Sequence, residues 1–248
     1  MSRHRSLTSL IAVVIAPFML AACADGFLQP QYPIAHRIEP DKGLTQYNDP
    51  LLNGARQTRV SYLGAFEYID YARFESNEVV LESVFDLATS IATVLDYHWT
   101  MMRMTNTWNL NADEEKSWGE PGTLQAYSGQ IDYRPYRLTE ENRNCIAFDS
   151  EWAFQPSDIL GRPTRIYFGY ACAQEGKTVS TETLVRVVES VRLSGVSRES
   201  LVPVDGRRSI DPIAISEAKG TPDGTTGNAK FPFNFGTVYQ EGDNERSR

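Results

Sequence analysis

CIAFDSEWAF (residues 145–154) and RIYFGYACA (residues 165–173) are the two stretches that decide the fold. In each, bulky apolar residues recur at every second position, which is the pattern of a β-strand with one buried face. The segment from Pro156 to Pro163, which includes Gly161, separates them and carries the residues that favour a turn. The two stretches are therefore predicted to form an antiparallel hairpin.

The segments on either side of this hairpin predict a domain with both helices and strands. TLQAYSGQIDYRPY (residues 123–136) also alternates and predicts a strand, while residues 60–77 fit either a strand pair or the lead-in to a helix. One long helix is predicted from about residue 78 to residue 105, because apolar side chains recur there at steps of three and four. Those side chains are Val80, Val84, Leu87, Ile91, Leu95, His98 and Met102.

A second helix is predicted after Ser180, which is a suitable N-cap, and it should stop near Gly195. Its apolar face would be formed by Leu184, Val187 and their neighbours. An amphipathic helix must bury its apolar stripe, most simply against a sheet. We therefore expect an α+β fold in which an antiparallel sheet of three to five strands is packed by two helices.

The N-terminus has the features of an export signal. Arg3 and Arg5 precede a short apolar stretch, residues 7–20, which is too short for a comfortable membrane span. The stretch ends in Leu20-Ala21-Ala22-Cys23, which resembles the lipobox of bacterial lipoproteins. The resemblance implies cleavage before Cys23, a diacylglyceryl group on its thiol, and acylation of the new N-terminus, commonly with palmitate. The alternative is an ordinary cleaved signal peptide followed by a chance cysteine.

Lipidation of Cys23 would hold the protein at a membrane, since two or more fatty chains anchor stably where one anchors only marginally. The expected location is the bacterial cell envelope, facing the periplasm. Ala24 follows the cysteine directly and Asp25 comes one position later. In enteric bacteria, lipoproteins with Asp directly after the cysteine tend to stay in the inner membrane, so this order favours the outer membrane slightly.

The composition divides the chain into four parts. We predict a signal peptide over residues 1–22, a proline-rich lipid-anchored tether over residues 23–57, a single α+β domain over residues 58–197, and a largely disordered tail over residues 198–248. The stretch KFPFNFGTVY (residues 230–239) within the tail could dock on the domain or on a partner, although composition alone favours an unstructured segment.

Two cysteines remain if Cys23 carries lipid. An even pair of cysteines in an exported protein predicts a disulfide, and the hairpin would bring Cys145 and Cys172 together. Two buried free thiols or a redox pair are the alternatives, but the chain has no C-x-x-C motif. A disulfide closing this loop would contribute about 3.5 kcal/mol in the chain-entropy model.

The charge of the chain excludes one class of partner. Without residues 1–22, the chain has 22 basic and 32 acidic residues, a net charge of −10. A nucleic-acid-binding protein needs a basic face to neutralise phosphates, so we expect no nucleic acid partner. We expect membrane contact through the lipid rather than through charge.

No pattern in the sequence predicts catalysis. His36 and His98 lie far apart without the spacing of a zinc site, and His98 is more simply a packed helical residue. Nucleophile-elbow, phosphate-loop and dinucleotide motifs are absent from the sequence. Asp149 and Glu151 share one face of a strand, which we interpret as the solvated face rather than half of a hydrolase site. We assign no catalytic residue, no metal ligand and no cofactor.

Aromatic residues are the most suggestive feature for ligand binding. Trp118, Tyr133 and Tyr136 flank predicted loops, where their rings could stack on the apolar faces of sugars. The alternative is that they fill the core, where tyrosine and tryptophan pack well.

The function expected from the sequence is therefore that of a non-catalytic, lipid-anchored envelope protein that engages a protein partner. Two alternatives remain open. One is a binding module for a glycan or small ligand on an aromatic-lined surface. The other is a hydrolase that acts on envelope polymers.

Overall fold

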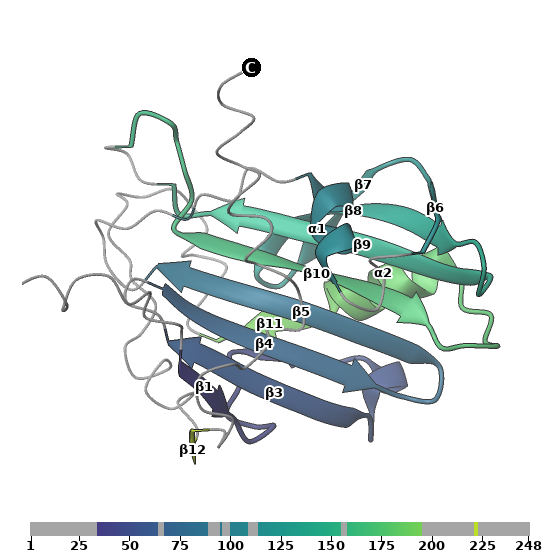
Figure 1. The fold of residues 1–248 in the computed structure, drawn as a ribbon, viewed down its shortest axis with the longest axis horizontal. Helices are drawn as coiled ribbons and strands as arrows, with labels where there is room; N and C mark the ends of the chain where they lie inside the picture. The colour runs from purple at the N-terminus through teal and green to yellow at the C-terminus, as the bar shows by residue number, and fades with distance from the viewer. Residues whose placement is uncertain are drawn as a thin grey trace, which may run out of the picture. The chain divides into compact units, whose positions relative to one another are not determined.

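The computed structural model describes residues 34–63, 67–88, 95, 100–108, 114–154, 158–194 and 221–222, all within a unit that spans residues 33–248. Strands dominate the described part of the chain (Figure 1). In chain order the elements are β1 (Ile34–Arg37), β2 (Thr45–Tyr47), the 3-10 helix η1 (Pro50–Leu52), β3 (Arg56–Leu63), β4 (Glu67–Glu75), β5 (Val79–Ala88), α1 (Met101–Thr107), β6 (Lys116–Trp118), β7 (Gly122–Ala126), β8 (Gly129–Leu138), β9 (Arg143–Trp152), β10 (Arg165–Ala173), α2 (Thr181–Glu189), β11 (Val191–Leu193) and β12 (Thr221–Pro222).

Ten of the strands form one antiparallel sheet in the order β12-β1-β3-β4-β5-β10-β9-β8-β6, with β7 also pairing with β8. Strands β6 and β7 share the outer side of β8, one along each half of it. The strands β2 and β11 form a separate two-stranded ribbon. The sheet is joined at its centre by β5 and β10, which are far apart in sequence.

Both faces of the central strands are buried. On one face, which we call the α2 face, Phe85 and Phe148 pack with Leu184 and Val188 of α2. On the opposite face, the α1 face, Val84 and residues of β9 and β10 pack with Met104 and Trp108, which lie in α1 and at its C-cap. The sheet therefore separates two apolar layers, each covered by a helix.

The central hairpin and the second helix are confirmed. Strands β9 and β10 pair antiparallel, and residues 172 and 145 lie directly opposite each other in the register. The N-cap of α2 is Ser180, whose side chain accepts a hydrogen bond from the backbone N–H of Thr183 at 3.3 Å. Residues 56–63 and 67–75 pair as the antiparallel strands β3 and β4 and are not a lead-in to a helix. Gly195, the expected stop of α2, lies outside the described residues; the helix itself ends at Glu189.

The long helix predicted over residues 78–105 is wrong for its first half. Residues 79–88 form strand β5, and within the part of residues 78–105 that the structure describes, the helix α1 begins at Met101. The reason is that β5 is central and buried on both faces, so nearly all of its side chains are apolar or buried. A continuous apolar run contains helical spacings by chance and cannot be told from a helix by periodicity. His98 lies outside the described residues.

Two further expectations need correction. The sheet has ten strands rather than three to five, partly because residues 34–57, expected to belong to a tether, contain β1, β2, η1 and the start of β3. The prolines in that segment punctuate short elements, as Pro50 does at the start of η1, instead of keeping the chain extended. Strand β12 lies in the predicted tail and pairs with β1. The stretch 230–239 lies outside the described residues.

Candidate functional site

A buried carboxylate is the most developed polar site on the α1 face. Glu82 projects from the middle of β5 and is 1% exposed. Its Oε2 accepts hydrogen bonds from the hydroxyl of Tyr71 at 2.7 Å and from the indole Nε1 of Trp108 at 2.8 Å. Its Oε1 accepts from the hydroxyl of Tyr170 at 2.7 Å and from the guanidinium of Arg73 at 2.8 Å. Two donors on each oxygen fill the usual capacity of a carboxylate.

The surroundings of Glu82 favour a fixed structural role for these groups. Burial, followed by the nearby charge of Glu82, raises the pKa of the Tyr71 and Tyr170 hydroxyls well above the ordinary range, so both remain donors. The Trp108 ring meets Phe168 and Tyr170 edge-on, each with a centroid separation of 5.5 Å. Arg73 pairs with the carboxylate and is itself partly exposed. A buried charge with this many partners is held in one position.

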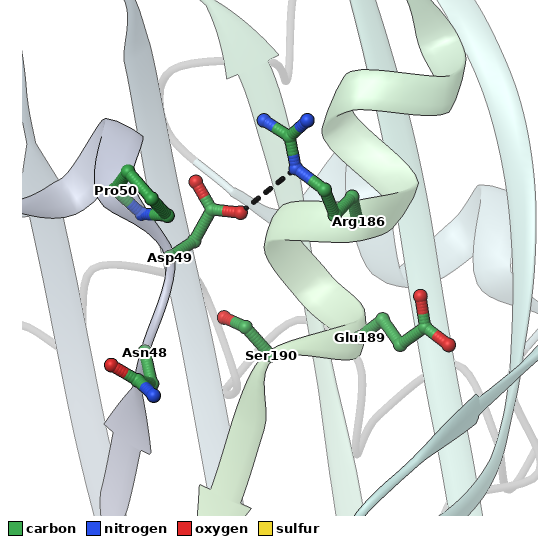
Figure 2. A pocket seen from close by; sticks show the side chains of 6 residues that line it. All are labelled: Asn48, Asp49, Pro50, Arg186, Glu189 and Ser190. Carbon is green, nitrogen blue, oxygen red and sulfur yellow. Dashed lines mark hydrogen bonds and ion pairs between the residues drawn. The ribbon is translucent and has the colours of Figure 1, made fainter.

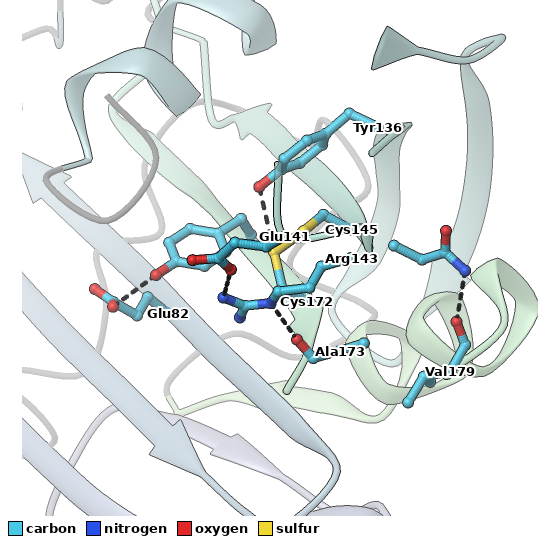
Figure 3. Close-up of a disulfide and its surroundings, with 10 residues drawn as sticks. Glu82, Tyr136, Glu141, Arg143, Cys145, Cys172, Ala173 and Val179 are labelled. Atoms are coloured by element: carbon cyan, nitrogen blue, oxygen red, sulfur yellow. Dashed lines mark hydrogen bonds and ion pairs between the residues drawn. A yellow bond between two sulfur atoms is a disulfide. The ribbon is translucent and has the colours of Figure 1, made fainter. Parts of the chain in front are cut away.

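The predicted disulfide lies beside this cluster. Cys145 and Cys172 are joined, their Cα atoms are 4.1 Å apart, and both residues are fully buried. Figure 3 shows the Tyr136 hydroxyl directed at the disulfide, 3.5 Å from the sulfur of Cys172. Arg143 ties the same end of the hairpin together by donating to the carbonyl of Ala173 at 2.8 Å. Because neither sulfur is accessible, the disulfide braces the sheet and is not poised for exchange.

The three aromatic residues predicted to bind a ligand do not form one surface. Trp118 pairs with Tyr136 across β6 and β8, with ring centroids 4.8 Å apart, and both lie on the α1 face. Tyr133 is three positions away on the same strand and packs with the core of the α2 face. Tyr136 is only 3% exposed. Trp118 is covered in part by Arg134, whose guanidinium carbon lies 5.8 Å from the ring centroid. The aromatic residues are therefore mostly used in packing.

Three carboxylates gather on the α1 face near the outer half of the sheet. Asp132 of β8 lies directly opposite Asp149 of β9, and Glu151 is two positions along the same strand. Asp132 and Glu151 are exposed and Asp149 is half-buried, so the interpretation of a solvated face fits Glu151 and fits Asp149 only in part. Burial, reinforced by the charges of Glu151 and Asp132, raises the pKa of Asp149 to about 7. A group with that pKa can exchange a proton near neutral pH.

A second buried polar cluster lies on the α2 face, under the β2–β11 ribbon. Asp70 is fully buried and accepts a hydrogen bond from the backbone N–H of Thr45 at 2.8 Å. Burial raises the pKa of Asp70, and the nearby guanidinium of Arg59 opposes this effect. The hydroxyls of Tyr47 and Tyr167 are in hydrogen-bond contact above them. These contacts pin the ribbon to the sheet, since they join residues far apart in sequence.

A shallow pocket is found where α2 meets η1. Figure 2 shows its lining, with Asp49 and Arg186 pointing toward each other across it. The Nε atom of Arg186 lies 3.1 Å from Oδ2 of Asp49, which also caps η1 by accepting from the backbone N–H of Leu51 at 2.9 Å. The remaining lining residues are Asn48, Pro50, Glu189 and Ser190. The ion pair holds η1 and α2 together, so Asp49 serves the fold of the domain at this pocket.

Within the described ranges, no group of three or more His, Cys, Asp or Glu side chains is arranged to hold a metal ion. None of the helices described there combines the length and hydropathy needed to cross a membrane. No protein-family model, curated protein or solved structure matches the chain.

Sequence reasoning missed the Glu82 cluster entirely. In the predicted long helix, Glu82 is an exposed acid of the first turn, and Trp108 lies in the loop that follows. One signal was present: Glu82 lies in a mostly apolar run, with Val80 and Leu81 before it and Val84 and Phe85 shortly after it, which is typical of a buried strand whose charge is paired. Its partners come from three other parts of the chain, and no local pattern connects them.

Proposed function

We propose that this protein is a lipid-anchored component of a bacterial cell envelope, held by lipid on Cys23 and facing the periplasm, and that it acts by binding a protein partner rather than by catalysis. The observation that carries the proposal is the buried Cys145–Cys172 disulfide, taken together with the lipobox. Disulfides form and persist in oxidising compartments such as the periplasm, and are rare in the cytosol. The cysteine usage and the N-terminal motif thus support the same location.

The polar groups of the domain support binding over chemistry. Both oxygens of Glu82 accept two hydrogen bonds each from within the domain. The carboxylate of Asp49, at the pocket, accepts hydrogen bonds from Arg186 and from the backbone N–H of Leu51 at the start of η1. Groups that are fully engaged by their own fold have little capacity left to act on a substrate.

The fold also bears on where a partner would bind. The α1 and α2 faces of the central strands are covered, which removes the sheet face as the contact surface. Edge strands keep backbone groups that can pair with another chain. Strand β6 pairs only with β8 in the described part of the chain, so we place the partner contact at this edge of the sheet.

The location is tested by comparing the wild-type protein with a Cys23→Ser variant, both expressed in a Gram-negative host. We expect the wild type to be processed to an N-terminal Cys23 that carries lipid mass, and to partition into detergent. The variant should be neither lipidated nor cleaved at that site. Unchanged processing and partitioning of the variant would refute the lipid anchor.

The partner is tested by crosslinking in the native envelope. A photoreactive amino acid at Lys116 of β6 should give a specific, reproducible adduct with one envelope protein. The same group at Asn77, which lies in the exposed turn between β4 and β5 and away from β6 in the strand order, serves as the matched control and should not give that adduct. Equal and unspecific adducts at both positions would count against partner binding at this edge.

A second candidate function follows from Asp149. A carboxylic acid with a pKa of about 7, next to two further carboxylates, has the protonation behaviour of a general acid in a glycosidase. If the protein is a hydrolase of envelope polymers, purified protein should release soluble fragments from peptidoglycan, and Asp149→Asn should abolish the release. Absence of fragments from the wild type would leave the binding function as the only candidate.

A further inference from the structure

The two ends of the sheet differ in how they meet solvent. The register places the start of β1 at the same end as the close of β3, since Ile34 pairs with Leu63. The register of the next strands places the first residue of β10 and the last residue of β9 at this same end, where Arg165 pairs with Trp152. We call it the anchor end, because the chain that leads from Cys23 enters the sheet there. It lies on the left in Figure 1, at the arrowheads of β3, β5 and β9.

Exposed apolar side chains concentrate at the anchor end. Ile159, Leu160 and Phe154, in the connection between β9 and β10, are 97%, 54% and 51% exposed. Tyr127, in the turn between β7 and β8, is 54% exposed and lies at the same end, since Ala126 pairs with Gly129 at the start of β8. Of the large apolar side chains that are exposed in the described residues, only Met102 of α1 lies elsewhere.

The opposite end is polar. Its connections are Ser76-Asn77-Glu78 between β4 and β5, Thr139-Glu140-Glu141-Asn142 between β8 and β9, and Gln174-Glu175-Gly176-Lys177 after β10. None of these described turns carries an exposed large apolar side chain. The asymmetry therefore belongs to the two ends of one sheet and is not a general property of its loops.

The apolar tip is held in position by its own contacts. Arg162 donates to the carboxylate of Asp158 through its backbone N–H at 2.8 Å, through Nε at 3.0 Å and through its terminal nitrogen at 2.9 Å. Gly161, with a φ of +61°, donates to the carbonyl of Asp158 at 3.0 Å and closes the turn. The ion pair neutralises the two charges nearest the tip and leaves Ile159 and Leu160 projecting between them.

We infer that the anchor end is a membrane-contact surface: Ile159 and Leu160 insert into the bilayer that holds the lipid on Cys23. This inference rests on the proposed lipid anchor. Eleven residue steps lead from Cys23 to Ile34, and even when fully extended they span at most about 40 Å. The anchor end therefore stays within that distance of the bilayer, at a high effective concentration. The lipid and the tip are two membrane contacts that together set the orientation of the sheet.

A bilayer fits this surface better than a protein does. Three of the exposed side chains lie in the β9–β10 connection and one in the β7–β8 turn, away from the pocket at η1 and α2 into which a partner's side chain would insert. Apolar tips at the end of a braced loop need only shallow burial at the headgroup boundary to remove their surface from water. Because the chain is acidic, the contact is driven by the apolar side chains, and we expect it to persist in high salt.

The test uses the full mature lipoprotein with an environment-sensitive fluorophore on Ile159→Cys. The native cysteines are occupied by lipid or by the disulfide, so the introduced thiol is the one that labels. The protein is reconstituted into vesicles of phosphatidylethanolamine and phosphatidylglycerol, free of other proteins. Glu140→Cys, exposed at the polar end, is the matched control, and Leu160→Cys is the second position in case the first variant labels poorly.

We expect the emission of the label at residue 159 to shift to shorter wavelength on reconstitution, with loss of quenching by aqueous iodide, while residue 140 shows no change. Flotation of the vesicles separately reports whether the lipid anchor is present. Protein that floats with the vesicles but has residue 159 as accessible as residue 140 would overturn the inference and leave the anchor intact. Shielding of residue 159 in native envelopes but not in these vesicles would also overturn it, in favour of a protein partner. Protein that fails to float would overturn the proposed anchor, and with it the inference.

Discussion

Replacement of Asp149 by asparagine should make the protein more stable at neutral pH. The folded-state pKa of this group is about 7, against an ordinary value of 3.8, because it is partly buried and faces the charges of Glu151 and Asp132. Below pH 3.8 the group is protonated in both the folded and the unfolded protein, and it costs nothing. As the pH rises from 3.8 to 7, the Asp149 carboxyl loses its proton in the unfolded protein but keeps it in the folded protein, so the free energy of unfolding falls.

The magnitude follows from the difference between the two pKa values. About three pKa units at 1.36 kcal/mol each give about 4 kcal/mol as an upper bound on the stability lost by pH 8. Because Asp149 keeps partial contact with solvent, which screens the charges around it, we expect about 2 to 4 kcal/mol. An asparagine side chain cannot ionise, so the Asp149→Asn variant should escape this loss.

The assay is urea unfolding of the mature protein in detergent micelles between pH 4 and pH 8, for the wild type and the Asp149→Asn variant. Other buried acids with raised pKa values, such as Asp70, make the free energy of unfolding fall with pH by the same amount in both proteins. Their contribution therefore cancels in the difference between wild type and variant. Glu151→Gln is the control, because removal of that charge should lower the pKa of Asp149 and shrink the pH dependence without abolishing it. A difference between wild type and variant that stays flat across this pH range would refute the reasoning.

Three further predictions concern stability. The Cys145→Ser, Cys172→Ser double variant should lose about 3.5 kcal/mol in urea unfolding, because the disulfide closes a loop with a sequence separation of 27; an unchanged midpoint would contradict this. Glu82→Ala should lower the free energy of unfolding by about 3 to 5 kcal/mol, because it removes the partner of a guanidinium and of three buried donors. Thermal melting measures this loss, and a loss below about 1 kcal/mol would show that water replaces the carboxylate. Gly169→Ala should prevent folding, since its Cβ would overlap the backbone oxygen of Glu82. Gly161 lies in open space at positive φ, so Gly161→Ala should lower the free energy of unfolding by only about 1 kcal/mol. Soluble yield and circular dichroism compare the two variants.

The hairpin, the disulfide and α2 could be predicted because their signals are local or nearly so. The apolar alternation of residues 145–154 and 165–173 and the turn residues between them fix the register that sets Cys145 opposite Cys172. Ser180 caps α2 through its own backbone neighbourhood. In each case, the residues that make the contact lie within a few tens of positions of each other, and their spacing carries the information.

The candidate site could not be predicted in the same way. Glu82 is bonded by Tyr71, Arg73, Trp108 and Tyr170, which reach it from β4, the end of α1 and β10. Its environment exists only once β5 has paired with β10, a strand that lies far along the chain. The split of Trp118 and Tyr136 from Tyr133 likewise depends on which residues of β8 face which layer.

The sequence by itself determined the local elements: which stretches can be strands, where α2 begins, which cysteines can pair, and the lipobox on which the proposed anchor depends. Only the tertiary structure decided that residues 79–88 are a strand, that residues 34–57 belong to the folded domain, and that the exposed apolar side chains gather at one end. The physical reason is that a segment buried on both faces loses the contrast between apolar and polar sides that marks a strand or a helix. Its conformation is then chosen by the neighbours it pairs with, and those neighbours are distant in sequence.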